Sequence, residues 1–265
     1  MTDSNQHSIL LEIQRSGFPY ADDLIHAFIG GSELHGAKVK NTDDMDIYGV
    51  YVEAPQFAIG LDRSEHYVWS TAGNERRNGP DDVDVTLYSL RKWAQLAAKG
   101  NPTALHFLFA GHAGHNIWQK IVKNTEAFLC RQSATQFLGF ADDQLKRVTG
   151  EKGRGRKGQR PELEQEFGYD TKAAMHTLRL LYECIELMAE ERITLPRPEK
   201  DLLIYVRTGG WTLEKLIQEA YKLFAAAKEA QLHSNLPESI DRHRISGLIA
   251  DAYLHHWKQS NSHPV

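Results

Sequence analysis

Residues 24–52 constrain the fold most strongly, because two apolar runs enclose a glycine turn and a cluster of carboxylates. The run LIHAFI leads into Gly30-Gly31, as a buried strand entering a turn does. The following residues, SELH at 32–35, predict the first turn of a short helix. The segment MDIYGVYV, residues 45–52, is rich in β-branched and aromatic residues and predicts the next strand.

A third strand is predicted over VDVTLYSL, residues 83–90, and its end passes into the helical pattern SLRKWAQLAAKG. Gly100 is expected to end that helix, and Asn101-Pro102 to begin the next one. Residues 53–82 lie between the second and third predicted strands. Their polar piece TAGNERRNGPDD predicts an exposed loop.

The second half of the chain has a helical period instead. Thr212 is expected to cap the last of its long helical segments. These segments are NIWQKIVKNTEAFLC, SATQFLGFADDQLKRV, DTKAAMHTLRLLYECIELMAEE and WTLEKLIQEAYKLFAAAKEA. The sequence therefore predicts an α/β (α+β) N-terminal domain over residues 1–112 and an all-helical C-terminal domain over residues 113–265.

Composition excludes several classes of protein. No apolar run approaches the roughly 18 residues that a membrane helix needs, and MTDSNQHSIL lacks the basic start of a signal peptide. Cys130 and Cys184 lie far apart without metal-ligand spacing, so buried, reduced thiols of a cytoplasmic protein are expected. The net charge of −4 means that binding to nucleic acid would need a local patch. KRVTGEKGRGRKGQR, residues 146–160, is such a patch, and a solvated loop is the alternative interpretation.

Three aspartates are candidates for a metal site. Side chains two apart on a strand share a face, so Asp44 and Asp46 should project together, with Met45 and Ile47 toward the core. Two carboxylates held this close repel unless a cation lies between them, and Mg²⁺ prefers hard oxygen ligands. Asp84, in the V-D-V of the third strand, would supply the third carboxylate of a two-metal site.

The glycine turn gives the aspartates a chemical context. Glycine lets a backbone approach a phosphate closely, and the amides after Gly31 and Ser32 could hold one. A phosphate cradle beside a magnesium site is typical of phosphoryl or nucleotidyl transfer. An acidic pair on a strand and a GGS turn are each common without function. The prediction depends on their order and spacing.

These residues resemble the DNA polymerase β nucleotidyltransferase superfamily, whose pattern is hG[GS], a short gap, Dh[DE]h and then h[DE]h. Further segments resemble one branch of it, the predicted nucleotidyltransferases associated with bacterial and phage RNA repair, over most of the chain. These segments are GSELHG, DMDIYGV, DVTLYSLRKWAQLAAKGNPTALHFLF, YDTKAAMHTLRLLY and LPRPEKDLLIYVRTGGWTLEKL. The resemblance implies a mixed β-sheet flanked by helices in the N-terminal domain.

The chain departs from the family pattern at two positions. Asp43 stands where a serine usually precedes the first catalytic aspartate, and it is expected to add negative charge to the approach of the site. His106 takes a place often held by glutamate. Neither change removes an expected metal ligand, but both bear on the choice of acceptor.

The resemblance also implies roles for individual residues. Asp44 and Asp46 would hold two Mg²⁺ ions, with Mn²⁺ as a substitute. Asp84 would bind the catalytic ion and help to activate the acceptor hydroxyl. Gly31 and Ser32 would hold the β- and γ-phosphates of ATP or another NTP.

Three basic residues of YDTKAAMHTLR are candidates for the triphosphate as well. Lys172, His176 and Arg179 are spaced i, i+4 and i+7, so they share one helical face. That face could close over the triphosphate and neutralise charge as pyrophosphate leaves. An exposed basic stripe, with His176 as a satisfied core histidine, is the structural alternative.

The implied activity is transfer of a nucleoside monophosphate from an NTP to an acceptor hydroxyl, with release of pyrophosphate. The acceptor is expected to be an RNA 3′ end, in the cytoplasm of a bacterial or phage-infected cell. Two alternatives remain: adenylylation of a protein, as in antitoxin-type members of the superfamily, and a nucleotide-binding regulatory module without catalysis. The presence of all three carboxylates argues against the second.

The basic stretch yields the first testable prediction. Replacing Arg154, Arg156 and Lys157 with alanine should weaken RNA binding. It should also flatten the slope of log affinity against log salt concentration by up to about three units, because fewer counterions leave the RNA when fewer cations bind its phosphates. Filter binding of a single-stranded RNA across a range of salt concentrations measures both quantities. Unchanged affinity and slope would mean that this stretch is only solvated.

Overall fold

The computed structural model describes residues 3–40, 42–73, 76, 78–111, 115–151 and 160–260. The chain forms two compact units. The sheet unit comprises residues 1–98, 103–128 and 240–265, and the helical unit comprises residues 99–102 and 129–239. The domain boundary predicted after residue 112 stays a prediction, and the compact units group residues 115–128 and 240–260 with the sheet.

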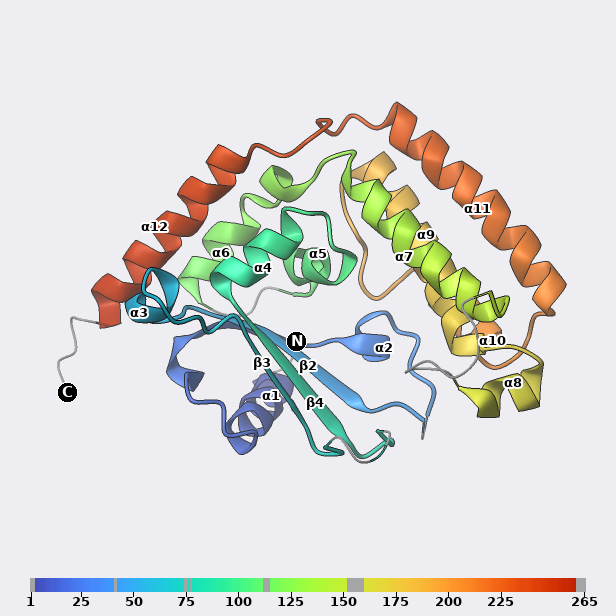
Figure 1. Ribbon diagram of the computed structural model, residues 1–265, viewed down its shortest axis with the longest axis horizontal. Helices are drawn as coiled ribbons and strands as arrows, with labels where there is room; N and C mark the ends of the chain where they lie inside the picture. The colour runs from blue at the N-terminus through green and yellow to red at the C-terminus, as the bar shows by residue number, and fades with distance from the viewer. Residues whose placement is uncertain are drawn as a thin grey trace. The chain divides into compact units, whose positions relative to one another are not determined.

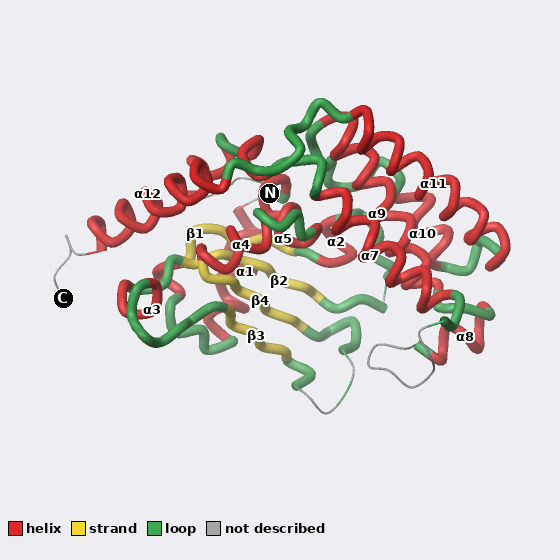
Figure 2. Tube along the Cα trace, turned by 45° about the horizontal axis from the view of Figure 1, so that its top comes forward, coloured by secondary structure: helices red, strands yellow, loops and turns green. Residues whose placement is uncertain are grey.

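In the described part of the chain, the sheet unit contains one sheet of four strands. Its strands are β1 (Leu24–Ile29), β2 (Met45–Tyr51), β3 (His66–Ser70) and β4 (Val83–Ser89). They lie in the order β1-β2-β4-β3, with β2 parallel to β4 and the two outer pairs antiparallel (Figure 2). The predicted fold class, a mixed sheet flanked by helices together with a helical C-terminal part, is confirmed.

Residues 53–82 hold two elements that the sequence did not predict. This segment contains the short helix α3 (Pro55–Ala58) and the edge strand β3. Strand β3 pairs on one side only and leaves Val68 63% exposed, so its sequence carries little of the alternation that marks a half-buried strand.

Helices cover both faces of the sheet, as Figure 1 shows, with α1 on one face and α4 to α6 on the other. The helices of the sheet unit are α1 (Asp3–Arg15), α2 (Gly31–Leu34), α3, α4 (Leu90–Ala97), α5 (Pro102–Phe109), α6 (Asn116–Val122) and α12 (Arg242–Ser260). Within the described ranges, this unit also contains the 3₁₀ helices Ala21–Asp23 and Thr125–Phe128. Neither α1 nor α12 was expected from the sequence.

Successive side chains along the strands point to opposite faces of the sheet and so pack into two separate layers. Odd-numbered residues such as Ile47 and Val85, both 0% exposed, pack with Ile9 and Ile13 of α1. Even-numbered residues face the other layer, where Phe28 of β1 and Tyr48 of β2 contact the ring of Phe107. This second face is also the one on which Asp46 and Asp84 lie.

Helix α4 connects the sheet to its second layer. Ser89 caps the helix, its side chain accepting a hydrogen bond from the Lys92 amide. Trp93 is 0% exposed, and its Nε1 donates to the Ala104 carbonyl at 3.0 Å. Its ring lies 4.8 Å from that of Trp118 and 5.3 Å from that of Phe128.

Helix α12 belongs to the sheet unit although more than a hundred residues separate it from α6. The Tyr253 hydroxyl accepts a hydrogen bond from the Arg91 amide at 3.0 Å. The indole nitrogen of Trp257 donates to the Glu53 carbonyl at 3.1 Å. Long-range contacts of this kind close the layer outside α4 and α6.

The helical unit is built around α9. Its helices are α7 (Ser133–Val148), α8 (Pro161–Phe167), α9 (Thr171–Glu190), α10 (Lys200–Arg207) and α11 (Leu213–His233). The other four pack against α9, whose N-terminus is capped by Asp170. Thr212 caps α11, as predicted.

Cys130 and Cys184 are buried and unpaired, as expected, and burial raises the pKa of the Cys184 thiol to about 12. Among the described residues, no helix has the length and apolar character needed to cross a membrane.

The packing of Trp93 leads to a stability prediction. Trp93→Ala should lower the free energy of unfolding by about 3–5 kcal/mol, because it leaves a cavity among aromatic rings and removes a buried hydrogen bond. Urea denaturation followed by circular dichroism measures the change. The control is Leu61→Ala, at a side chain that is 102% exposed, which should shift stability by less than about 0.5 kcal/mol. Equal effects of the two substitutions would contradict the packing described here.

Candidate active site

The three predicted aspartates come together at one end of the central strands. Strands β2 and β4 pair in a parallel register that places Asp46 directly opposite Asp84. Asp44 lies two residues before Asp46, immediately ahead of β2. One carboxylate oxygen from each of the three lies within 4.8 Å of the others, and all three residues are partly buried.

This proximity has an electrostatic cost. Two unit charges 4.8 Å apart repel by roughly 3–4 kcal/mol at an effective dielectric constant of about 20. The amide of Asn78 offsets part of it, because its Nδ2 donates to Asp44 Oδ2 at 2.7 Å and to Asp84 Oδ2 at 2.6 Å. The other oxygen of Asp84 is buried and has no hydrogen-bond partner among the described residues.

The donor set fits a hard divalent cation. It offers three carboxylates, one of them with a buried oxygen that no described donor satisfies. Mg²⁺ and Mn²⁺ take oxygen ligands of this kind. An ion held there would remove the repulsion between the carboxylates, part of which the amide of Asn78 offsets.

The glycine turn packs directly against β2. The Gly30 amide donates to the Asp46 carbonyl at 2.7 Å, and Gly31 has a φ of +54°. A Cβ atom at Gly31 would lie 1.8 Å from Asp46 Oδ2, and one at Gly30 would lie 2.1 Å from Tyr48 Cδ2. Any side chain at Gly31 would therefore displace the carboxylate of Asp46.

The two departures from the family pattern have structural roles. Asp43 is 2% exposed, and its Oδ2 accepts hydrogen bonds from the Ser32 hydroxyl at 2.9 Å and the Val39 amide at 3.0 Å. The carboxylate orders the turn that carries Ser32. Its expected effect, an added negative charge at the approach to the site, stays a prediction. His106 is also buried, and its ring lies 4.7 Å from that of His35.

Asn78 is a site residue that the sequence did not reveal. It lies in TAGNERRNGPDD, which predicted only an exposed loop, and the Asn-Gly pair it forms with Gly79 is an ordinary turn signal. The buried carboxylate of Asp82 fixes the position of the loop that carries Asn78. It accepts two hydrogen bonds from Arg76, at 2.5 and 2.7 Å, and one from the Gly79 amide at 2.7 Å.

These bonds make the loop sensitive to acid. The hydrogen bond from Arg76 first, then those from Gly79 and Thr71, hold the pKa of Asp82 well below its ordinary range. A depressed carboxyl pKa contributes stability above the unfolded value of about 3.9, and that contribution is lost as the pH falls through the folded value. The loop that carries Asn78 is therefore fully held at neutral pH.

The basic residues predicted for the triphosphate lie on α9 in the helical unit. Lys172, His176 and Arg179 are partly exposed on that helix, while most of the residues between them are buried. Arg179 Nη1 donates to both oxygens of the fully buried Glu183, at 2.9 and 3.0 Å. Their action on a triphosphate stays a prediction. Arg154, Arg156 and Lys157 lie outside the described residues.

Two further cations that follow Asp84 in sequence are engaged in the sheet unit itself. Arg91 Nη1 donates to the Ala58 carbonyl at 3.1 Å, and Lys92 forms an ion pair with Glu65 at 2.9 Å. These contacts hold the end of β4 against the segment before β3.

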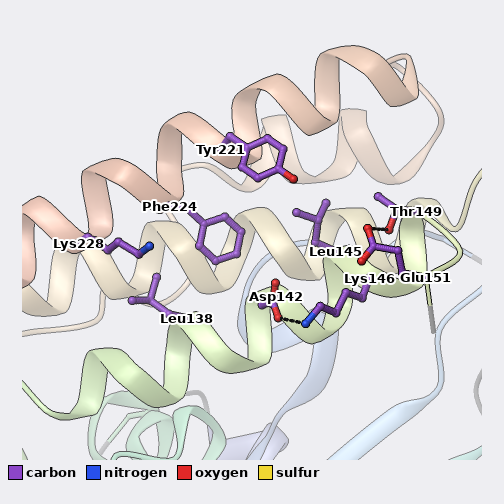
Figure 3. A pocket seen from close by; sticks show the side chains of 9 residues that line it. All are labelled: Leu138, Asp142, Leu145, Lys146, Thr149, Glu151, Tyr221, Phe224 and Lys228. Carbon is purple, nitrogen blue, oxygen red and sulfur yellow. Dashed lines mark hydrogen bonds and ion pairs between the residues drawn. The ribbon is translucent and has the colours of Figure 1, made fainter.

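A pocket of about 360 Å³ lies in the helical unit between α7 and α11 (Figure 3). Its lining residues are Leu138, Asp142, Leu145, Lys146, Thr149, Glu151, Tyr221, Phe224 and Lys228. Lys146, the first cation of the basic stretch, forms an ion pair with Asp142 at 2.6 Å, which raises the pKa of the lysine. With two acids matching two lysines, the lining offers no excess positive charge for a phosphate.

The contact between Gly31 and Asp46 leads to a prediction with a built-in control. Gly31→Ala and Gly17→Ala both place alanine at a positive φ, +54° and +77°, and each should cost about 1–2 kcal/mol of stability. Only position 31 meets an obstacle, because nothing lies within 4 Å of a Cβ at Gly17. Gly31→Ala should therefore also weaken Mn²⁺ binding by about tenfold or more, measured by calorimetric titration. Equal Mn²⁺ affinity in the two variants would contradict the role given to this contact.

Comparison with known proteins places the chain in a family. The family described as RNA repair pathway DNA polymerase beta family matches residues 5–261. A protein of Enterobacteria phage T4, described as an uncharacterized 38.9 kDa protein, is 32% identical over 78 residues, which are 29% of this chain and 23% of the phage protein. A nucleotidyltransferase-like protein from Exiguobacterium sibiricum 255-15 is 14% identical, with a TM-score of 0.30 over 86% of this chain and 74% of that chain. Because the family match spans nearly the whole sequence, the chain belongs to the RNA repair pathway DNA polymerase beta family.

Proposed function

We propose that the protein is a divalent-metal-dependent nucleotidyltransferase that moves a nucleoside monophosphate from an NTP to an acceptor hydroxyl and releases pyrophosphate. The convergence of Asp44, Asp46 and Asp84 within 4.8 Å carries this proposal. Membership of a DNA polymerase β-type nucleotidyltransferase family supports it.

The carboxylates would divide the work between them. Asp44 and Asp46 would hold both Mg²⁺ ions, and Asp84 would hold one of them and orient the acceptor hydroxyl. When bound, the ions would favour deprotonation of that hydroxyl and offset the charge of the leaving pyrophosphate. The parallel register of β2 and β4 keeps Asp46 and Asp84 on the same face without any movement of the backbone.

The glycine turn would hold the triphosphate. Gly31, which has no room for a side chain, keeps the start of α2 against Asp46, so phosphates bound there would lie beside the carboxylates. The Ser32 hydroxyl, oriented by its bond to Asp43, would contact the β- or γ-phosphate. Lys172, His176 and Arg179 would supply positive charge as pyrophosphate leaves.

The proposed acceptor is the 3′ hydroxyl of an RNA. The description of the family, an RNA repair pathway, supports this choice. The basic composition of residues 146–160 supports it as well, although the described end of that stretch is partly neutralised by Asp142. The setting we propose is the cytoplasm of a bacterial or phage-infected cell.

The carboxylates provide the decisive test. The double substitution Asp44→Asn and Asp46→Asn should lower Mg²⁺-dependent NTP turnover by at least about 10³-fold, because it removes the charge that holds the ions. The measurement incubates the protein with each α-labelled NTP, Mg²⁺ and cellular RNA, then follows pyrophosphate release and sequences the RNA 3′ ends.

A matched control changes two exposed carboxylates of the sheet unit, Asp22→Asn and Asp62→Asn, and should leave turnover within about twofold of the wild type. Unchanged turnover in the Asp44→Asn, Asp46→Asn variant would overturn the proposed mechanism. Label that appears on protein and not on RNA would keep nucleotidyl transfer and reject the RNA acceptor.

A further inference from the structure

Within the proposed active site, one neutral amide lies between two carboxylates. Asn78 Nδ2 is 2.7 Å from Asp44 Oδ2 and 2.6 Å from Asp84 Oδ2. We propose that Asn78 both positions the carboxylates of the cation site and becomes a ligand of the ion. Its NH₂ group holds the two carboxylates together before an ion binds, and its amide then turns to present Oδ1 to the ion. This inference rests on the proposed function, because it assumes that the carboxylates bind a cation.

The charge of the surroundings decides which end of the amide faces the carboxylates. Without an ion, the two oxygens attract the NH₂ group, and both contacts are as short as charge-assisted hydrogen bonds. A bound cation would reverse this preference, because it would repel the NH₂ hydrogens and attract the amide oxygen. Rotation about the Cβ–Cγ bond of Asn78 exchanges the two ends, and this torsion is broad and nearly two-fold.

The backbone around Asn78 is anchored to both strands that carry the carboxylates. Arg76 and Gly79, on either side of it, donate to the Asp82 carboxylate. The Asp82 carbonyl accepts a hydrogen bond from the Met45 amide at 2.8 Å, which ties the loop to the start of β2. Asp82 is followed directly by Val83, the first residue of β4. The side chain of Asn78 can therefore turn while its backbone stays in place.

Among the residues that the structure describes, the amide oxygen of Asn78 accepts one long hydrogen bond. The described contact to it comes from the Ser70 hydroxyl at 3.4 Å, a long hydrogen bond. The Ser70 oxygen itself accepts a hydrogen bond from the Ala72 amide at 3.2 Å. Of the contacts that the described residues make, turning the amide gives up this long bond on the oxygen side and two short bonds on the nitrogen side, which a bound ion would replace.

Substitutions that separate the two ends of the amide test the proposal. Asn78→Ala removes both the NH₂ group and the amide oxygen. It should weaken Mn²⁺ binding by about 10- to 100-fold, because the ion loses an oxygen ligand and Asp44 and Asp84 lose the group that bridges them. Asn78→Asp keeps an oxygen, loses the NH₂ group and adds negative charge. It should bind Mn²⁺ at least as tightly as the wild type, while its thermal unfolding temperature in EDTA should fall below that of the wild type.

The experiment is a calorimetric titration of the full chain with Mn²⁺ in the absence of nucleotide, paired with thermal unfolding in EDTA. Asn124→Ala is the matched control, because this partly buried asparagine of the sheet unit donates its amide to the Lys120 carbonyl, and its printed contacts do not include the three aspartates. It should bind Mn²⁺ within about twofold of the wild type.

The outcomes separate this inference from the proposed function. If the wild type binds Mn²⁺ no better than the Asp44→Asn, Asp46→Asn variant, the cation site fails and both proposals fall with it. If the wild type binds and Asn78→Ala binds equally well or more tightly, only the role of Asn78 is overturned. Weakened binding in both Asn78→Ala and Asn78→Asp would also overturn it, because the amide would then act only by holding the loop.

Discussion

The parallel pairing of β2 with β4 is the constraint on which the candidate site depends. A parallel register places Asp46 opposite Asp84 on one face of the sheet, and the period of two brings Asp44 to the same side. A shift of the register by one residue would send Asp84 into the layer packed against α1. The buried neighbours of the two aspartates, Ile47 and Val85, prevent that shift because they fill the same layer.

Two further segments complete the site, and both are positioned by carboxylates that would not themselves hold the ion. Asp43 orders the glycine turn through Ser32 and Val39, and Asp82 orders the loop that carries Asn78. Each of these acids directly precedes a strand residue or a metal-site residue in the sequence. The acids at the described site therefore have two roles. Asp43 and Asp82 accept hydrogen bonds from protein donors and order the loops, whereas the three clustered aspartates lie close enough together to favour a cation.

Local patterns were enough to predict the central part of the sheet unit. Strands β2 and β4 are rich in β-branched and aromatic residues, and the aspartates interrupt them at fixed spacing, so both the strands and the carboxylates were predicted. The edge strand β3 was not, because an edge exposes residues such as Val68 and loses the alternation that reveals a strand. Asn78 and the burial of Asp43 were missed for another reason: each depends on a contact that exists only once the chain has folded. The arrangement of Lys172, His176 and Arg179 on one helix followed from their spacing, whereas their function could not be deduced from it.

The return of α12 to the sheet unit has a consequence for how the protein is made. Arg91, Glu53 and the layer over α4 and α6 receive contacts from Tyr253 and Trp257, which are translated after the whole helical unit. During synthesis, the surface of α4 and α6 that α12 covers therefore stays exposed until about 110 intervening residues have been translated. During that interval the emerging polypeptide exposes the kind of surface that chaperones recognise.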